Sequence, residues 1–119
     1  MSKLLLTNVT KNFSNSSGEV TCVLKGIDLE ISDGAFFTLL GASGCGKSTL
    51  LNIVAGFEDV SGGEILIDSH AIEGPGTDRT VIFQDVSNAL FPYMTVFENV
   101  EFGPKMSGQG KSDRKIAVE

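Results

Sequence analysis

The chain has 119 residues, of which 41% are hydrophobic and 20% charged, an ordinary composition for a soluble globular domain with one small core. Its net charge is −6 and its isoelectric point is near 4.7, which argues against nucleic acid as the main partner. No apolar run approaches the roughly 18 residues of a membrane span, and Leu4–Leu6 is too short for the apolar part of a signal peptide. We therefore expect a cytoplasmic protein.

Two β-rich segments open the chain. Residues 3–13 and 20–31 are rich in apolar and β-branched residues, and the turn signal Asn15-Ser16-Ser17-Gly18 separates them. This pattern predicts an antiparallel pair of strands. A later turn at 59–63 precedes a third predicted strand at 64–67. We expect residues 1–34 and 60–72 to be mainly antiparallel β-structure.

Residues 36–57 contain the most informative motif. Residues 41–49 fit G-x-x-x-x-G-K-[ST], the phosphate-binding P-loop. The apolar run 36–40 before the motif predicts a buried strand. Residues 48–55 lack glycine and proline and are followed by Gly56, which predicts a helix.

The chemistry of this motif explains its residue types. Glycines allow backbone N–H groups to surround an anion, and the positive end of the following helix dipole favours phosphate. The lysine adds a point charge, and the hydroxyl can bind Mg²⁺, which takes few protein ligands beside phosphate oxygens. The alternative is a glycine-rich turn that binds nothing. The candidate phosphate-binding residues are Gly41, Ser43, Gly44, Cys45, Gly46, Lys47, Ser48 and Thr49.

The chain has two cysteines, Cys22 and Cys45, whose number and spacing fit a reducing compartment and indicate no metal site. Cys45 lies inside the P-loop motif near a predicted helix N-terminus. Two interpretations are open for it: an acidic, reactive thiol, or a small residue whose backbone alone binds phosphate. His70 is interpreted as a surface turn residue without a role.

The region 80–103 is predicted to begin with a strand. Thr80–Phe83 form a short apolar run that ends at Gln84, after a break at Gly74-Pro75-Gly76. Residues 95–102 are predicted to form a helix. Its N-cap is Thr95, and Glu98 follows three residues later in a capping-box pattern.

At this point the chain resembles the ATP-binding subunit of an ABC transporter over essentially all of its length. The resemblance implies an α/β fold of the P-loop NTPase class, with an antiparallel β-subdomain and the first part of a parallel-sheet core. Residues 104–119 would then begin the helical subdomain. The narrower similarity, to importers of the nitrate, sulfonate and taurine type, rests on residues 74–79. The segments that carry the wider resemblance are 23–31, the P-loop with 50–57, 61–65, 81–84, 90–92 and 95–100.

The resemblance implies roles for individual residues. Lys47 would contact the β- and γ-phosphates of ATP, Ser48 would bind Mg²⁺, and the amides of 43–49 would wrap the phosphates. Gln84 matches the Q-loop glutamine, which contacts Mg²⁺ or the attacking water; a solvated polar residue at a strand end is the alternative. Phe13 lies where the family places an aromatic residue that stacks on adenine; an ordinary core phenylalanine is the alternative.

The resemblance also implies partners and a location. Phe91, Tyr93 and Met94 follow the Q-loop, where the family contacts its transmembrane subunits; they could equally be core residues of a helical segment. A second ATP-binding subunit is expected to face the first in the full-length family. The protein would lie on the inner face of the cell membrane, held there by the transporter subunits.

One departure from the family is large. No hydrophobic run ending in Asp-Glu follows Gln84, and the signature segment and switch histidine are also not found in these 119 residues. We therefore expect an N-terminal part of the ATPase domain that cannot hydrolyse ATP efficiently, because phosphoryl transfer needs a positioned water and charge stabilisation on both sides of the γ-phosphate. Two alternatives to a transport ATPase remain: a nucleotide-binding fragment without activity, and another P-loop class such as a kinase or GTPase.

Overall fold

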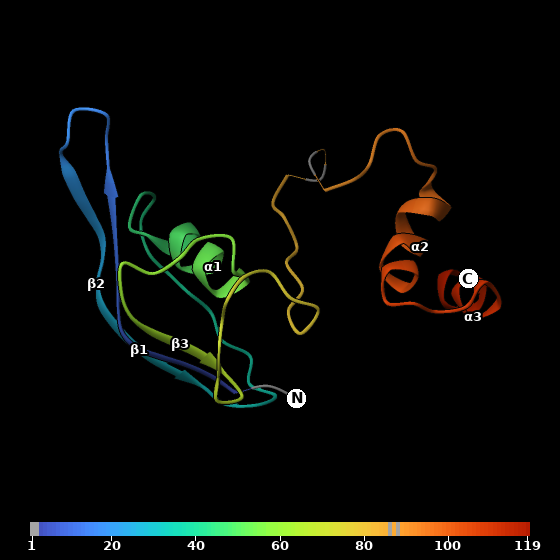
Figure 1. The fold of residues 1–119 in the computed structure, drawn as a ribbon, viewed down its shortest axis with the longest axis horizontal. Coiled ribbons are helices and arrows are strands. Elements are labelled where there is room, and N and C mark those ends of the chain that lie inside the picture. The colour runs from blue at the N-terminus through green and yellow to red at the C-terminus, as the bar shows by residue number, and fades with distance from the viewer. Residues whose placement is uncertain (1–2, 86, 88) are drawn as a thin grey trace. The chain divides into compact units, whose positions relative to one another are not determined.

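The computed structural model describes residues 3–85, 87 and 89–119. The chain divides into two compact units, Met1–Thr80 and Val81–Glu119. In these described residues, the first unit contains a sheet and one helix, and the second contains two helices (Figure 1). The two units are described separately below.

The sheet of the first unit has the strand order β2-β1-β3-β4, with every neighbouring pair antiparallel. Strand β1 spans Leu4–Ser14 and β2 spans Val20–Ile31. The turn between them is held by Asn15, whose Oδ1 accepts hydrogen bonds from the Ser17 and Glu19 amides at 3.1 and 2.9 Å. The predicted hairpin is confirmed.

The third predicted strand is also present. Strand β3 spans Gly62–Ile67 and pairs with β1, not with the P-loop segment. Two left-handed residues, Asp68 and Ser69, then turn the chain into the two-residue strand β4, His70–Ala71. A two-residue turn with positive φ at both positions matches the twist of an antiparallel hairpin. His70 is exposed on this short strand.

Helix α1 spans Lys47–Ala55 and packs its apolar side on the sheet (Figure 1). It ends at Gly56, whose left-handed φ of 85° lets the Gly56 and Phe57 amides bond to the Ile53 and Asn52 carbonyls. The core joins residues of three strands and the helix: Leu6, Val9, Leu24, Leu50, Ile53 and Ile65.

Two predicted strands are wrong. Residues 36–40 and 80–83 have no regular secondary structure. A strand needs a hydrogen-bonded neighbour, and within residues 3–85, 87 and 89–119 no strand pairs with either segment. Phe36 and Leu40 are therefore 97% and 90% exposed, and Ile82 is 93% exposed.

The second unit contains helices α2, Val96–Met106, and α3, Lys111–Val118. The predicted capping box is confirmed: the Glu98 amide donates to Thr95 Oγ1, and the Thr95 amide donates to Glu98 Oε2. The helix continues past the predicted end at Phe102. Pro104 lies inside its last turn, and the Ser107 amide continues the bonding to the Gly103 carbonyl at 3.0 Å.

The two helices of this unit are joined by an ion pair. Arg114 Nε lies 2.8 Å from Glu101 Oε1, and both side chains are only 18% exposed. Arg114 also donates to the Gln109 carbonyl at 2.9 Å. Across the parts of both units that the structure describes, no helix has the length and apolar character needed to cross a membrane.

Candidate nucleotide-binding site

The P-loop forms a concave turn at the start of α1. Gly44 and Gly46 have left-handed φ values of 79° and 98°, and the Cys45 amide bonds to the Ala42 carbonyl at 3.3 Å. Gly46 is the residue from which α1 begins. Left-handed turns of this kind present backbone N–H groups in a concavity, and the helix start adds positive potential. The local structure is therefore suited to an anion.

An open cavity of about 550 Å³ lies against this loop. Six of the eight predicted phosphate-binding residues line it, together with one residue of β2. The lining residues are Ser43, Gly44, Gly46, Lys47, Ser48, Thr49 and Val23.

Val23 reaches the cavity because β2 is irregular at this point. Lys11 pairs with Leu24, and Asn12 pairs with Cys22, so Val23 is an extra residue in β2 opposite two consecutive residues of β1. Such a bulge re-aims a side chain. A Cβ on Gly46 would lie 3.2 Å from Val23 Cγ1 and 3.0 Å from Leu24 Cδ2, which shows how closely β2 approaches the loop.

The ammonium group of Lys47 lies within the loop. Its Nζ donates to the Gly41 carbonyl and, at 2.8 Å, to the Ala42 carbonyl, and lies 3.4 Å from Cys45 Sγ. A Cβ on Gly41 would lie 2.6 Å from that sulfur and 3.7 Å from Nζ. Gly41 thus leaves the space that the Cys45 side chain occupies, whereas 3.7 Å from Nζ is an ordinary contact. Cys45 itself is an exposed free thiol.

Phe13 lies on β1 beside the strand pairs that flank Val23. It pairs with Thr21 of β2, and Phe13 is 40% exposed. Lys11 Nζ lies over its ring, 5.0 Å from the centroid. A half-exposed ring of this kind has apolar surface left for a ligand, which a closed core phenylalanine lacks.

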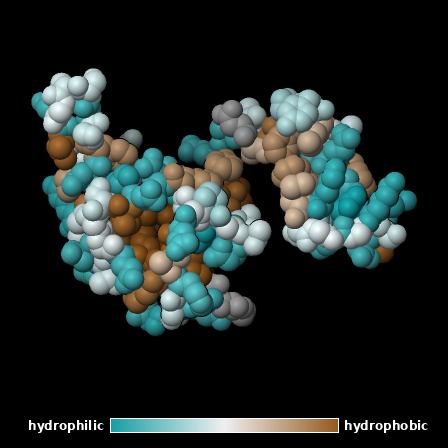
Figure 2. Space-filling model, viewed as in Figure 1, coloured by the Kyte–Doolittle hydropathy of each residue, from teal (hydrophilic) through white to brown (hydrophobic). Residues whose placement is uncertain are grey.

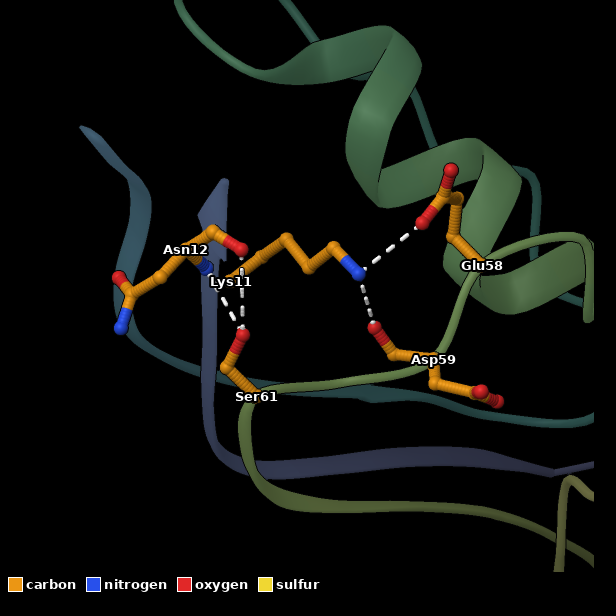
Figure 3. A network of polar contacts seen from close by, with 5 residues as sticks. All are labelled: Lys11, Asn12, Glu58, Asp59 and Ser61. Carbon is orange, nitrogen blue, oxygen red and sulfur yellow. Dashed lines mark hydrogen bonds and ion pairs between the residues drawn. The ribbon is translucent and has the colours of Figure 1, made fainter. Parts of the chain in front are cut away.

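A polar network ties β1 to the segment that follows α1 (Figure 3). Lys11 Nζ lies 3.0 Å from Glu58 Oε2 and donates to the Asp59 carbonyl at 2.7 Å. Next to it, Ser61 Oγ accepts a hydrogen bond from the Asn12 amide at 2.9 Å. These contacts hold the strand that carries Phe13 against the end of the helix whose start carries Lys47.

Gln84 belongs to the second unit, so its predicted approach to Ser48 and Mg²⁺ remains a prediction. In that unit, the segment before α2 is organised by Asn99. Its Oδ1 accepts from the Phe91 amide at 2.8 Å, and its Nδ2 donates to the carbonyls of Phe91, Met94 and Thr95.

The three residues expected at a membrane-subunit contact differ in exposure. Tyr93 is 77% exposed, whereas Phe91 and Met94 are half-buried. The Phe91 ring packs on Phe102, with ring centroids 4.8 Å apart. Phe91 is therefore a packed residue, as the core alternative expects, whereas Tyr93 is a surface residue.

Sequence reasoning missed Val23, Lys11 and Asn99. Val23 depends on a bulge, which has no reliable local signature. Lys11 could have been noticed as a lysine two residues before Phe13 on a predicted strand, since such residues share a face. Asn99 could have been noticed as a polar residue one turn after the Thr95 cap, since residues four apart are neighbours on a helix.

Comparison with known proteins adds to this geometry. Residues 24–118 match the family described as ABC transporter. The chain is 41% identical to the taurine import ATP-binding protein TauB of Roseobacter denitrificans over 119 residues, all of this chain and 44% of that protein. It is 50% identical to the bicarbonate transport ATP-binding protein CmpC of Synechococcus elongatus over 114 residues, 94% of this chain and 17% of that protein.

Solved structures show the same fold. The ATP-binding cassette MJ0796, in a dimeric post-hydrolysis state with ADP and Pi, aligns with a TM-score of 0.77 and 31% identity. That alignment covers 97% of this chain and 54% of the cassette. The chain thus spans about half the length of this cassette, and 44% of the taurine-import relative.

Proposed function

The chain belongs to the ABC transporter family, and from this premise we propose that it binds MgATP as part of the ATP-binding subunit of a solute importer. The observation that carries the proposal is the position of Lys47, the first residue of α1, in a cavity lined by the P-loop. An ammonium group beside left-handed glycines at a helix start is a binding site for a chain of phosphates.

The residues of the loop fit the expected ligands. Lys47 would neutralise the terminal phosphates after exchanging its bonds to the Gly41 and Ala42 carbonyls. Ser48 offers one hydroxyl beside the cavity, and one protein ligand suits Mg²⁺, which takes most of its ligands from phosphate and water. When bound, Mg²⁺ would supply charge neutralisation for the phosphates. Gln84 is proposed as a further contact to Mg²⁺ or the attacking water, and Phe13 as the stacking surface for adenine.

The transport role is part of the same proposal. Support comes from relatives named for taurine import and bicarbonate transport, and from the family itself. We infer that the protein lies on the cytoplasmic face of the membrane, with transmembrane subunits contacting the region of Phe91, Tyr93 and Met94. Pairing with a second ATP-binding subunit is inferred from a similar cassette that is described as dimeric.

Thermal unfolding with and without MgATP tests the binding proposal. A ligand at one hundred times its Kd stabilises the folded state by about 2.7 kcal/mol. For a domain of this size that corresponds to a rise in Tm of roughly 10 °C or more. Lys47→Ala should abolish the rise, whereas Lys3→Ala, at a surface ion pair with Glu30, should retain it.

The shift on adding MgATP is the relevant quantity, because Lys47→Ala also removes two hydrogen bonds and can lower Tm by itself. Equal shifts in the wild type and Lys47→Ala would overturn the proposal. Hydrolysis is tested separately: we propose that these 119 residues alone release phosphate from MgATP no faster than Lys47→Ala does. Turnover well above that background would refute the second statement and leave the first intact.

A further inference from the structure

Lys11 and Phe13 lie two residues apart on β1, so their side chains share one face of the strand. Lys11 Nζ lies over the Phe13 ring at 5.0 Å from its centroid. The Lys11 side chain is only 12% exposed, whereas Phe13 is 40% exposed. One face of the ring is thus covered by a largely buried cation, and part of the ring remains open to solvent.

The Lys11 ammonium group has two further partners. Glu58 Oε2 lies 3.0 Å from Lys11 Nζ, and the Asp59 carbonyl accepts its hydrogen bond at 2.7 Å (Figure 3). Both partners lie in the segment that follows the C-cap of α1, Gly56. Lys11 therefore has little freedom to swing away from the ring, and the ring is restrained relative to the helix that begins in the P-loop.

We propose that Lys11 is a positioning residue for nucleotide-base recognition, which covers one face of the Phe13 ring and leaves the other face for adenine. The inference rests on the proposed function, in which Phe13 stacks on the base. A held cation favours one orientation of the ring through the attraction between a charge and a π-face. A ring that is already oriented loses less freedom when a base stacks on it.

This role predicts a selective defect. Lys11→Met keeps the aliphatic stem and removes the charge, so it should weaken binding of MgATP by roughly three- to fivefold. Binding of magnesium tripolyphosphate should not change, because that ligand has no base. Isothermal titration calorimetry on the full 119-residue chain measures both ligands. Lys11→Arg keeps the positive charge and should bind MgATP with the affinity of the wild type. Lys3→Met, a lysine on the segment leading into the same strand, is the matched control and should change neither affinity.

A double-mutant cycle separates positioning from general packing. With Phe13→Leu the ring is gone, so adding Lys11→Met should cause no further loss of MgATP affinity. An undiminished loss in that background would overturn the inference, as would an equal loss for tripolyphosphate. If Lys11→Met does not fold, Glu58→Gln replaces it: this variant removes the ion pair and should weaken MgATP alone by about twofold. No loss for MgATP, or an equal loss for tripolyphosphate, would then overturn the inference.

The same binding measurements distinguish failure of the proposed MgATP binding from failure of the role of Lys11. A wild-type chain that binds neither MgATP nor tripolyphosphate overturns the proposed function and this inference together. A wild type that binds both, with dependence on Lys47, but with Lys11→Met unchanged, overturns the role of Lys11 alone.

Discussion

Two glycines of the first unit share the same backbone angle but not the same surroundings. Gly18 and Gly56 both have φ of 85°. A Cβ on Gly18 would meet nothing within 4 Å, whereas on Gly56 it would lie 2.2 Å from the carbonyl carbon and oxygen of Gly74. A side chain at Gly18 would therefore meet only the strain of a left-handed backbone, whereas a side chain at Gly56 would also clash with the backbone of Gly74.

Alanine at these positions should destabilise to different extents. Gly18→Ala should lower the free energy of unfolding by about 1 kcal/mol, the strain of a left-handed residue with a Cβ. Gly56→Ala should lower it by roughly 3 kcal/mol or more, because the Gly74 backbone must also move and overpacking adds its own cost. Urea denaturation of both variants measures the difference. Equal losses in the free energy of unfolding would show that the close approach of residue 74 to the end of α1 does not add to the destabilisation.

The residues of the phosphate cradle could be predicted, because the P-loop motif states residue type and spacing together. The structure supports this part: six of the eight predicted residues line the cavity, and Lys47 begins the helix. Val23 could not be predicted, because its position depends on a one-residue irregularity between β1 and β2. The partners of Lys11 could not either, since Glu58 and Asp59 are distant from it in sequence.

At the scale of elements, the segment before α2 depends on one side chain. Asn99 bonds to four backbone groups of residues 91–95, including the Phe91 amide at 2.8 Å. This segment is the proposed contact with transmembrane subunits. Its shape is thus set by a residue of the following helix rather than by its own aromatic side chains.

Removing the Asn99 amide should loosen this segment. Asn99→Ala leaves the Phe91 amide without its acceptor, so we expect its hydrogen exchange to become roughly tenfold faster or more, in keeping with about 1–3 kcal/mol for a partner lost from such a bond. The amide of Arg114, which bonds to the Gly110 carbonyl in α3, is the internal reference and should exchange as before. Unchanged protection at Phe91 would contradict the organising role of Asn99.

The capping box of α2 predicts a pH dependence. The pKa of Glu98 is lowered from its ordinary 4.5, mainly by the hydrogen bond from the Thr95 amide and then by that from the Thr95 hydroxyl. Because the folded pKa lies below the unfolded one, the stabilisation is present above about pH 4.5 and is lost as the pH falls through the lowered value. The start of α2 should therefore fray in acid.

Substitution of Thr95 tests the cause of this shift. Thr95→Val removes the hydroxyl and keeps the amide, so the pKa of Glu98 should rise part of the way towards 4.5. Thr95→Ser keeps both donors and should leave the titration of Glu98 as in the wild type. NMR titration of the Glu98 carboxyl carbon follows all three chains. A Thr95→Val curve that coincides with the wild type would exclude the hydroxyl as a cause.

The antiparallel strands and α2 could be predicted because their signals are local: alternation, a turn at Asn15, and the Thr95 cap. The segments 36–40 and 80–83 show the limit of such signals. Their apolar residues favour a strand that is buried between two neighbouring strands. The local sequence contains no information on whether those neighbouring strands are present. In the described parts of the chain no strand pairs with them, so the same residues remain without regular structure.

At the scale of the whole molecule, the first unit taken by itself has apolar surface that its own elements do not cover. Figure 2 shows hydrophobic residues at the surface of the face of this unit that is turned to the viewer. An apolar groove of about 470 Å³ is lined by side chains of β1, β2, α1 and residues 36–39. Phe36, which lines the groove, is 97% exposed, and Leu40, which directly follows the lining segment in sequence, is 90% exposed. Contiguous apolar surface of this kind is uncommon on monomeric proteins and promotes association.

The 119-residue chain should therefore self-associate at micromolar concentrations, because association removes this apolar surface from water. Sedimentation velocity over a concentration series measures the effect. The double substitution Phe36→Ser with Leu40→Ser should shift the population towards monomer, since it removes two large exposed apolar side chains without touching the buried core. Val20→Ser, at a position 66% exposed near the hairpin turn, removes an apolar side chain away from the groove and should leave association unchanged. If Val20→Ser dissociates the chain as well as the double variant does, association follows total apolar exposure rather than this face. If the wild type sediments as a monomer throughout, the uncovered groove does not drive association at all.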